Sequence, residues 1–209
     1  MVIRIIFAAL AEIAATKNIL NRDLNLNPWL CIFKFSCITS GCVLKHFNRL
    51  KRNKATGIDQ LPPNMLKDCS EEISGPLASI INLSLNTHTI PTLWKSAKIS
   101  PVFKSGNPDL VENYRPISIL PILFKLLERT VHDQLYNFFE DNNILSNCQF
   151  GFRKRRSIKL ATVLLCDSVR KSFENGHPVG CLFLDLLKAF DTMGHNIILE
   201  KIVTWCKWS

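Results

Sequence analysis

The string Phe-Leu-Asp-Leu-Leu-Lys-Ala-Phe-Asp, at residues 183–191, carries most of the information about this fold. It overlaps a continuous apolar run at residues 179–184, and such a run predicts a strand buried on both faces. Asp185 would then stand at the carboxyl end of that strand. A lone Asp in this position usually does no more than end a strand, so a chemical role for Asp185 depends on the surrounding residues.

Helical and extended patterns alternate upstream of this string, which predicts a mixed α/β fold. The longest apolar stripe of helical period covers residues 119–139 and is expected to form core. Further helices are predicted near residues 43–50, from Pro63 until Pro91, and over residues 158–173.

A hairpin is predicted between Pro91 and the apolar stripe at residues 119–139. Residues 98–104 alternate as a strand, and the sequence Ser-Gly-Asn-Pro-Asp at residues 105–109 is a strong turn signal. A second extended segment follows, through Arg115. The hairpin therefore carries Lys104 on one arm and Arg115 on the other.

The composition is basic, with 26 Lys and Arg residues against 17 Asp and Glu and a formal net charge of +9. A basic excess of this size favours a polyanionic partner such as nucleic acid. The positive charges gather in two runs, residues 45–54 and residues 153–159. For each run, a solvated helix face or loop is the alternative to a phosphate-binding groove.

Several classes of protein are disfavoured by the remaining composition. The 8 cysteines form no Cys-x-x-Cys pair, so a zinc site is not expected, and their apolar neighbours suggest buried, reduced thiols of an intracellular protein. No apolar run reaches the ~18 to 20 residues that span a bilayer, so no membrane association is expected.

Residues 1–32 contain an Asn-rich stretch that breaks any helix, and we expect a poorly ordered leader there.

Four strings, in this order, resemble the reverse transcriptases of non-LTR retrotransposons of the LINE-like, jockey type. The strings lie at residues 54–59, at 99–107 with 113–118, at 149–153 and at 183–191. The resemblance runs from about residue 33 to the end. It implies a right-hand polymerase fold, with fingers at residues 33–160 and the first part of the palm at residues 161–209.

The resemblance also implies RNA-directed DNA synthesis from deoxynucleoside triphosphates, on an RNA template with a DNA primer. Two Mg²⁺ ions would assist this phosphoryl transfer. The side chains to which it assigns roles are Asp185 (catalytic and metal-binding), Lys104, Arg115 and Phe190 (nucleotide-binding), and Arg153, Lys154, Arg155 and Arg156 (nucleic-acid-binding). Arg forks onto phosphate oxygens, whereas Lys supplies a point charge.

Some of these residues also have a simpler structural explanation. Phe190 can be a core aromatic, Lys104 can be merely solvated, and Asp191 is better placed to cap a following helix than to bind metal. Leu187 and Ile158 depart from the family pattern, as expected of a decaying element copy.

The sequence reaches Ser209 before the family's motif B and its Ala-Asp-Asp type motif C. We therefore expect no polymerase activity from this polypeptide alone. The alternative function is a catalytically inactive, nucleic-acid-binding remnant of a retrotransposon. An organellar intron maturase shares the fold but is disfavoured by the Lys-Ala-Phe-Asp form of the string at residues 183–191. The oligomeric state is not indicated, and an intracellular location can be nuclear or cytoplasmic.

Overall fold

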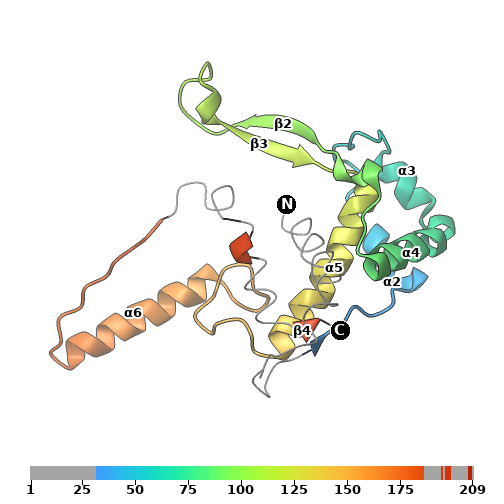
Figure 1. The fold of residues 1–209 in the computed structure, drawn as a ribbon. Coiled ribbons are helices and arrows are strands. Elements are labelled where there is room, and N and C mark those ends of the chain that lie inside the picture. Colours follow the sequence, from blue (N-terminus) through green and yellow to red (C-terminus); the bar gives the residue numbers. More distant parts are fainter. Residues whose placement is uncertain (1–31, 186–193, 195, 199–206, 209) are drawn as a thin grey trace.

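The computed structural model describes residues 32–185, 194, 196–198 and 207–208 (Figure 1). Within them the chain combines helices with a small antiparallel hairpin, so the predicted mixed α/β character is confirmed at this level. The helices are α2 (Ser40–Asn48), α3 (Pro63–Asp68), α4 (Ser70–Thr87), α5 (Ile122–Asp141) and α6 (Ile158–Glu174), with short 3-10 turns η1 (Thr92–Lys95) and η2 (Val111–Asn113). Strands β2 (Lys98–Phe103) and β3 (Tyr114–Ile119) pair antiparallel, and β1 (Ile32–Phe33) pairs parallel with β4 (Lys207–Trp208).

The hydrophobic core lies where α2, α4 and α5 meet (Figure 1). Each helix presents an apolar stripe to the other two, which is how amphipathic helices bury area. The fully buried or nearly buried side chains at this junction are Val43 and Phe47 of α2, Leu77, Ile81 and Leu85 of α4, and Phe124, Leu127, Val131 and Leu135 of α5. The stripe predicted over residues 119–139 is therefore confirmed as core.

Two side-chain amides hold the segment before α2 against this core. Asn82 of α4 accepts a hydrogen bond from the Ile38 backbone N–H and donates one to the Ile38 carbonyl, both at 2.8 Å. Gln134 of α5 binds the backbone of Ser36 in the same two-sided way, at 2.7 and 3.1 Å. These amides take the place of a neighbouring strand, because they satisfy both the N–H and the carbonyl of one extended residue.

The loop after α2 returns to the start of α5 through a close contact at Gly57. Gly57 is buried, and a Cβ added to it would lie 2.8 Å from backbone atoms of Pro121. Only a residue without a side chain allows this approach. The string at residues 54–59 is thus fixed directly beneath the N-terminus of α5.

The helix predicted from Pro63 until Pro91 is divided in the structure. Cys69 has φ −95° and ψ 15°, and at this non-helical residue α3 gives way to α4. His88 adopts a left-handed conformation, φ 55°, and ends α4 before Pro91 is reached. The apolar spacing identified the helical region but contained no signal for the break.

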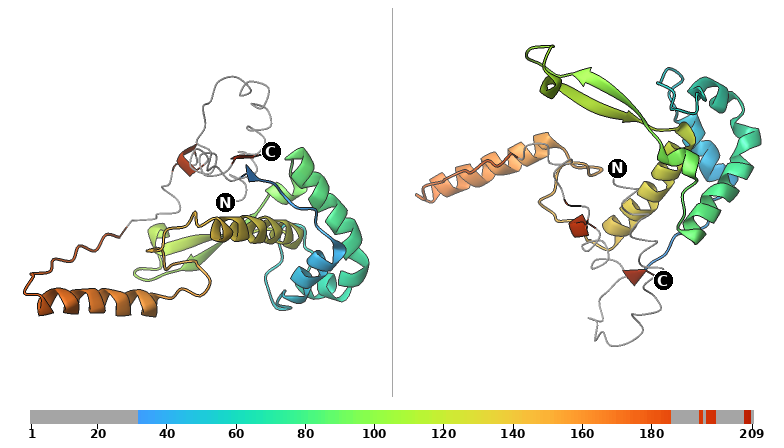
Figure 2. Two further views of the ribbon diagram at one scale, coloured as in Figure 1. Left: turned by 90° about the horizontal axis from the view of Figure 1, so that it is seen from below. Right: turned by 45° about the horizontal axis from the view of Figure 1, so that its top comes forward.

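Helix α6 was correctly predicted as a helix, but it stands apart from the core helices and buries none of its residues (Figure 2). The chain at residues 177–185 then runs back beside α6. Residues 179–184 form no strand, and Leu182, Phe183 and Leu184 are 83, 80 and 83% exposed, so the expectation of a buried strand was wrong for this structure. A strand needs a neighbour to satisfy its backbone, and the described residues place none beside this run.

The expectation of buried cysteines was also wrong for the thiols that the structure describes. These are Cys37, Cys42, Cys69, Cys148, Cys166 and Cys181, and all are exposed and free. Apolar neighbours in sequence do not set burial on a helix, because adjacent residues point in different directions. Cys42, for example, is exposed although the next residue, Val43, is fully buried. None of the described helices is long and apolar enough to cross a membrane.

Candidate nucleic-acid interface

The hairpin brings the two predicted nucleotide-binding residues to one face. Val102 lies opposite Arg115 in the register of β2 and β3, and the Lys104 N–H continues the ladder by donating to the Asn113 carbonyl at 2.8 Å. Side chains alternate between faces along a strand. Lys104 and Arg115 are therefore diagonal neighbours on the same face, and diagonal neighbours have Cα atoms about 7 to 8 Å apart. Both side chains are exposed.

The turn between the two arms is fixed by its own hydrogen bonds. Asn107 accepts a hydrogen bond from the Asp109 N–H at 3.0 Å, and the Asn113 side chain donates to the Asn107 carbonyl at 2.7 Å. Gly106 has φ +95°, and a Cβ there would lie 2.8 Å from the Asn113 amide nitrogen. The spacing of the basic arms is thus set by the fold of the turn.

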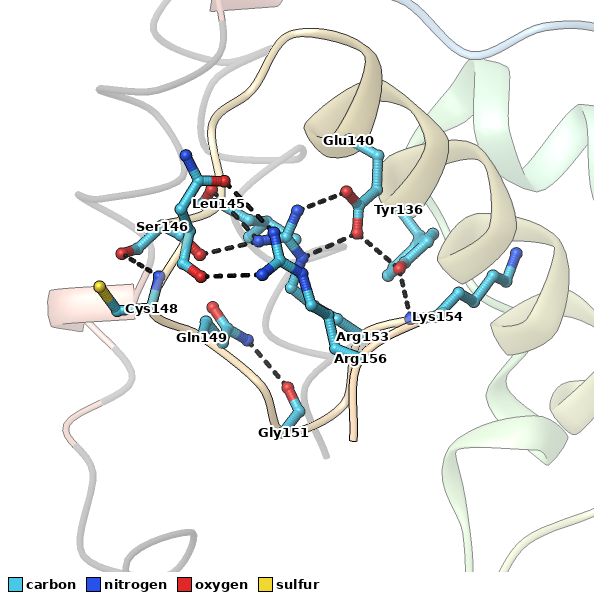
Figure 3. A network of polar contacts seen from close by, with 11 residues as sticks. Tyr136, Glu140, Leu145, Ser146, Cys148, Gln149, Gly151, Arg153, Lys154 and Arg156 are labelled. Atoms are coloured by element: carbon cyan, nitrogen blue, oxygen red, sulfur yellow. Dashed lines mark hydrogen bonds and ion pairs between the residues drawn. The ribbon is translucent and has the colours of Figure 1, made fainter. Parts of the chain in front are cut away.

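The basic run at residues 153–156 divides into side chains with different surroundings. Arg153 is only 9% exposed and forks onto Glu140, with Nε–Oε1 at 3.0 Å and Nη2–Oε2 at 2.6 Å (Figure 3). It also donates to the Ser146 carbonyl at 2.7 Å. Arg153 therefore fastens the loop after α5 to the end of that helix, and its guanidinium faces the protein interior.

Tyr136 completes this network (Figure 3). Its hydroxyl donates to Glu140 Oε1 at 2.6 Å and accepts the Lys154 N–H at 2.8 Å. Hydrogen bonds from Arg153 and then Tyr136 lower the pKa of Glu140 from 4.5 to about 2. The carboxylate is therefore charged well below neutral pH, in the form that accepts both hydrogen bonds.

The other three basic side chains differ in how they face solvent. Lys154 is exposed and its Nζ lies 4.8 Å from the centre of the Tyr136 ring. Arg155 is exposed and has φ 60°. Arg156 is half-buried and donates to the Asn147 carbonyl at 3.2 Å. Lys154 and Arg155 are thus better placed than Arg153 or Arg156 to meet a phosphate.

Asp185 is exposed, at the end of the irregular segment beside α6. Among the described residues, no hydrogen bond or ion pair joins it to Lys104 or Arg115. The same part of the chain contains no group of three or more His, Cys, Asp or Glu side chains that could hold a metal ion, so the described residues do not make a complete Mg²⁺ site. Phe190 and Asp191 lie outside the described residues.

One match to a known protein family covers both Lys104 and Arg115 of the hairpin and Asp185. A profile described as reverse transcriptase (RNA-dependent DNA polymerase) covers residues 102–206, which are 105 of the 209 residues. The chain belongs to the reverse transcriptase family. Lys104, Arg115, the basic run at residues 153–156 and Asp185 all fall inside this reverse transcriptase match.

Curated relatives of this chain include proteins named as polymerases of mobile elements. The probable RNA-directed DNA polymerase from transposon BS of Drosophila melanogaster is 31% identical over 161 residues, which are 77% of this chain and 18% of that protein. The RNA-directed DNA polymerase from mobile element jockey of the same fly is 30% identical over 176 residues, 84% of this chain and 19% of the relative. The resemblance to jockey-type elements is confirmed, and the chain spans about a fifth of the length of these relatives.

One group of basic residues was not identified from the reverse transcriptase sequence. His46 and Arg49 of α2 and its C-cap, with Lys125 and Arg129 of α5, line a pocket of about 260 Å³. Of these four residues, the run at residues 45–54 suggested only Arg49. The contribution of α5 had no local signal, because it comes from residues far along the chain.

Proposed function

We propose that this chain is part of an RNA-directed DNA polymerase of a jockey-like retrotransposon, which adds deoxynucleotides to a primer on an RNA template. The observation that carries the proposal is the reverse transcriptase match over residues 102–206, which contains Lys104, Arg115 and Asp185. In this proposal the chain has a right-hand polymerase fold. Residues 1–32 are a leader, residues 33–160 the fingers, and residues 161–209 the first part of the palm.

The hairpin binds the incoming nucleotide in this proposal. Lys104 and Arg115 share one exposed face, so their long side chains can reach different phosphates of one triphosphate. The guanidinium forks onto two oxygens while the ammonium supplies a point charge. The fixed turn at Gly106 and Asn113 holds the arms in place before the ligand arrives, which lowers the ordering cost of binding.

Asp185 supplies one carboxylate of the catalytic centre, with Phe190 beside the sugar of the nucleotide. Reverse transcriptases use divalent metal ions, which stabilise charge on phosphate oxygens during transfer. The other ligands come from outside the described residues. Lys154 and Arg155, and Arg156 to a smaller extent, follow the template backbone without reading its sequence.

Nucleotide binding tests this function and distinguishes it from the inactive, nucleic-acid-binding remnant. Calorimetric titration with deoxythymidine triphosphate should show binding that uncharged thymidine lacks, because the hairpin recognises phosphate. Arg115→Gln and Lys104→Gln should each weaken the affinity by about tenfold, the loss of one charge-assisted contact of about 1.5 kcal/mol. Lys159→Gln, an exposed basic residue of α6, is the matched control and should change nothing.

The remnant predicts another pattern. Binding of single-stranded RNA without any binding of the triphosphate would favour the remnant and count against the polymerase. Equal affinity for the triphosphate in Arg115→Gln and Lys159→Gln would remove the hairpin from the nucleotide site.

A further inference from the structure

A pocket lined mainly by cations lies between α2 and α5, on a different part of the molecule from the hairpin tip. Its volume is about 260 Å³, and it is lined by His46, Arg49, Leu50, Lys125, Leu126 and Arg129. A water occupies about 30 Å³ in the liquid, so the pocket has room for a tetrahedral oxyanion. No acidic side chain is among the lining residues.

The two helices supply the basic groups in pairs. His46 and Arg49 are three residues apart, and Lys125 and Arg129 are four residues apart, so each pair occupies one face of its helix. Because α2 and α5 pack on one another, the two basic faces meet at the pocket. Like charges placed together in this way repel, unless an anion lies between them.

The charges in the pocket are only partly compensated by the protein. Arg129 Nε lies 3.5 Å from Asp133 Oδ1, and Asp133 is shared with His132 at 3.1 Å. Among the described residues, none forms a hydrogen bond or ion pair with the Lys125 ammonium or the Arg49 guanidinium. Two cationic groups of the pocket therefore lack a direct counter-ion within that part of the chain.

His46 adds an unsatisfied polar atom. Its Nδ1 is buried and has no hydrogen-bond partner among the described residues. Buried polar atoms are rarely left unpaired, and the exceptions call for a ligand, a water or an ion. A phosphate in the pocket would stabilise the protonated form of the His46 ring through its negative charge.

The electrostatic field at His46 agrees with this geometry. Burial lowers the pKa of His46 most, Asp133 opposes that shift, and Arg129, Arg49 and Lys45 lower the pKa further. Burial also lowers the pKa of Lys125, while Glu128 and Asp59 raise it and Lys54 lowers it. An anion in the pocket would offset the effect of Arg129, Arg49 and Lys45 on His46.

A purely structural explanation for the cations is the C-terminus of α2, where positive charge offsets the helix dipole. Lys67 already serves this end of the helix, because its Nζ donates to the carbonyls of Asn48 and Leu50 at 2.9 and 3.2 Å. Lys125 lies in the first turn of α5 and Arg129 one turn later, and near a helix N-terminus the dipole disfavours positive charge. The dipole therefore does not account for the pocket.

We propose that the pocket between α2 and α5 binds a backbone phosphate of a nucleic-acid strand. The lining offers cations and two aliphatic side chains, and its one aromatic ring is the imidazole of His46, with no Phe, Tyr or Trp. It is therefore better suited to a phosphate than to stacking a base. A nucleic acid is the polyanion that a chain with a formal charge of +9 in the reverse transcriptase family would meet. The inference rests on the proposed function, because that function supplies the strand.

Histidine NMR of the full chain tests the pocket directly. Titration with a short oligo-deoxythymidylate at low salt should raise the pKa of His46, because the bound phosphate stabilises the imidazolium. His88 and His177, which lie outside the pocket, are internal references. Inorganic phosphate is the second probe, and it separates a general oxyanion site from a site for a strand.

Matched arginine variants link the pocket to strand affinity. Arg129→Gln removes a pocket cation that is 54% exposed, so the fold should survive. Arg170→Gln removes an arginine of α6 that is 64% exposed and paired with acidic residues at helical spacing, as Arg129 is. We expect Arg129→Gln to weaken oligonucleotide binding about fivefold and to reduce the slope of log K against log salt by about 0.7, as for one lost phosphate contact on a single strand. Arg170→Gln should do neither.

Each outcome has a definite meaning. A rise in the pKa of His46 with the oligonucleotide, together with the loss in Arg129→Gln alone, supports the pocket. Oligonucleotide binding without a response at His46, or with equal affinities of the two variants, overturns the pocket and leaves the proposed function standing. A response to inorganic phosphate alone overturns the assignment to a nucleic-acid strand. No response to either probe and no oligonucleotide binding would overturn both the pocket and the nucleic-acid partner of the proposed function.

Discussion

Glu140 carries the clearest pH dependence among the single residues. Its pKa is about 2 in the folded protein against an ordinary value of 4.5, because Arg153 and Tyr136 donate hydrogen bonds to the carboxylate. A carboxyl whose pKa is lowered by folding stabilises the fold fully above its unfolded pKa. That contribution should fall as the pH drops from about 4.5 towards about 2.

Glu140→Gln should therefore lower the stability of the loop after α5 near neutral pH, since Gln cannot accept a charge-assisted fork from Arg153. The difference from the parent should shrink as the pH approaches about 2, where the native carboxyl is itself protonated. Urea unfolding of both proteins across this pH range measures the difference. Glu174→Gln, in a pair with 58% exposure of the carboxylate, is the control and should have little effect at any pH. A Glu140→Gln difference that is constant with pH would contradict the role of the ion pair.

Asn82 gives a second prediction for a single side chain. Asn82→Ala removes both partners of the Ile38 backbone and should cost about 1 to 3 kcal/mol, the penalty for leaving buried polar groups unsatisfied. Asn86→Ala, one turn later in α4 and exposed, is the matched control. Chemical denaturation of the two variants decides the point, because equal stabilities would mean that water replaces the amide.

The sequence predicted which elements carry the basic residues better than it predicted the direction in which each side chain points. The hairpin signals correctly placed Lys104 and Arg115 on two arms, because strand alternation and a strong turn are local properties. The run at residues 153–156 looked uniform in sequence. Phe152 and Arg155 both have φ 60°, so the chain turns within the run and points consecutive side chains in different directions. Arg153 reaches Glu140, a partner that lies in another element and that no local pattern indicated.

Among the elements, the loop between α2 and α3 depends on one glycine. Gly57→Ala places a Cβ 2.8 Å from the Pro121 backbone at the start of α5, and overpacking of this kind costs about 1 to 3 kcal/mol. Gly75→Ala is the control, because its Cβ would meet nothing within 4 Å and it is exposed within α4. That change should stabilise the protein by up to about 1 kcal/mol, the helix propensity of Ala over Gly. Thermal unfolding of both variants should give shifts of opposite sign, and a neutral Gly57→Ala would mean that the loop can move away.

Elements with local signals were predicted, and those that depend on neighbours were not. Helices α5 and α6 follow from apolar periodicity, which is a property of the segment itself. The run at residues 179–184 has strand composition but no strand beside it in the described structure, and composition alone cannot supply backbone partners. The division between α3 and α4 depends on the conformation of Cys69, for which the sequence has no marker.

On the scale of the whole molecule, apolar surface is distributed unevenly. The junction of α2, α4 and α5 is packed, whereas α6 and the segment beside it are largely exposed (Figure 2). Val163, Leu164 and Phe173 of α6 are 62, 50 and 64% exposed, and Phe183 is 80% exposed. The resemblance leads us to expect that Asp185 converges with Lys104 and Arg115 on one cleft, and this expectation stays a prediction. The strings identified Asp185 and the hairpin, but their relative positions depend on how the chain after α6 is packed.

The last prediction concerns association of the chain. Contiguous exposed apolar surface promotes association in water, while a formal net charge of +9 opposes it by repulsion. Light scattering should therefore increase with added salt, because screening shortens the range of the repulsion to about 8 Å near physiological ionic strength and leaves the apolar contacts unaffected.

Paired charge substitutions on α6 should separate these two effects. Val163→Lys combined with Leu164→Lys should reduce both the scattering and the binding of an apolar fluorescent dye. Leu93→Lys combined with Val111→Lys adds the same charge by changing two apolar side chains that are each 83% exposed, in η1 and η2. This matched control should leave both nearly unchanged. Scattering that falls with salt, or that responds equally to both substitutions, would show that charge rather than the apolar face of α6 governs the association.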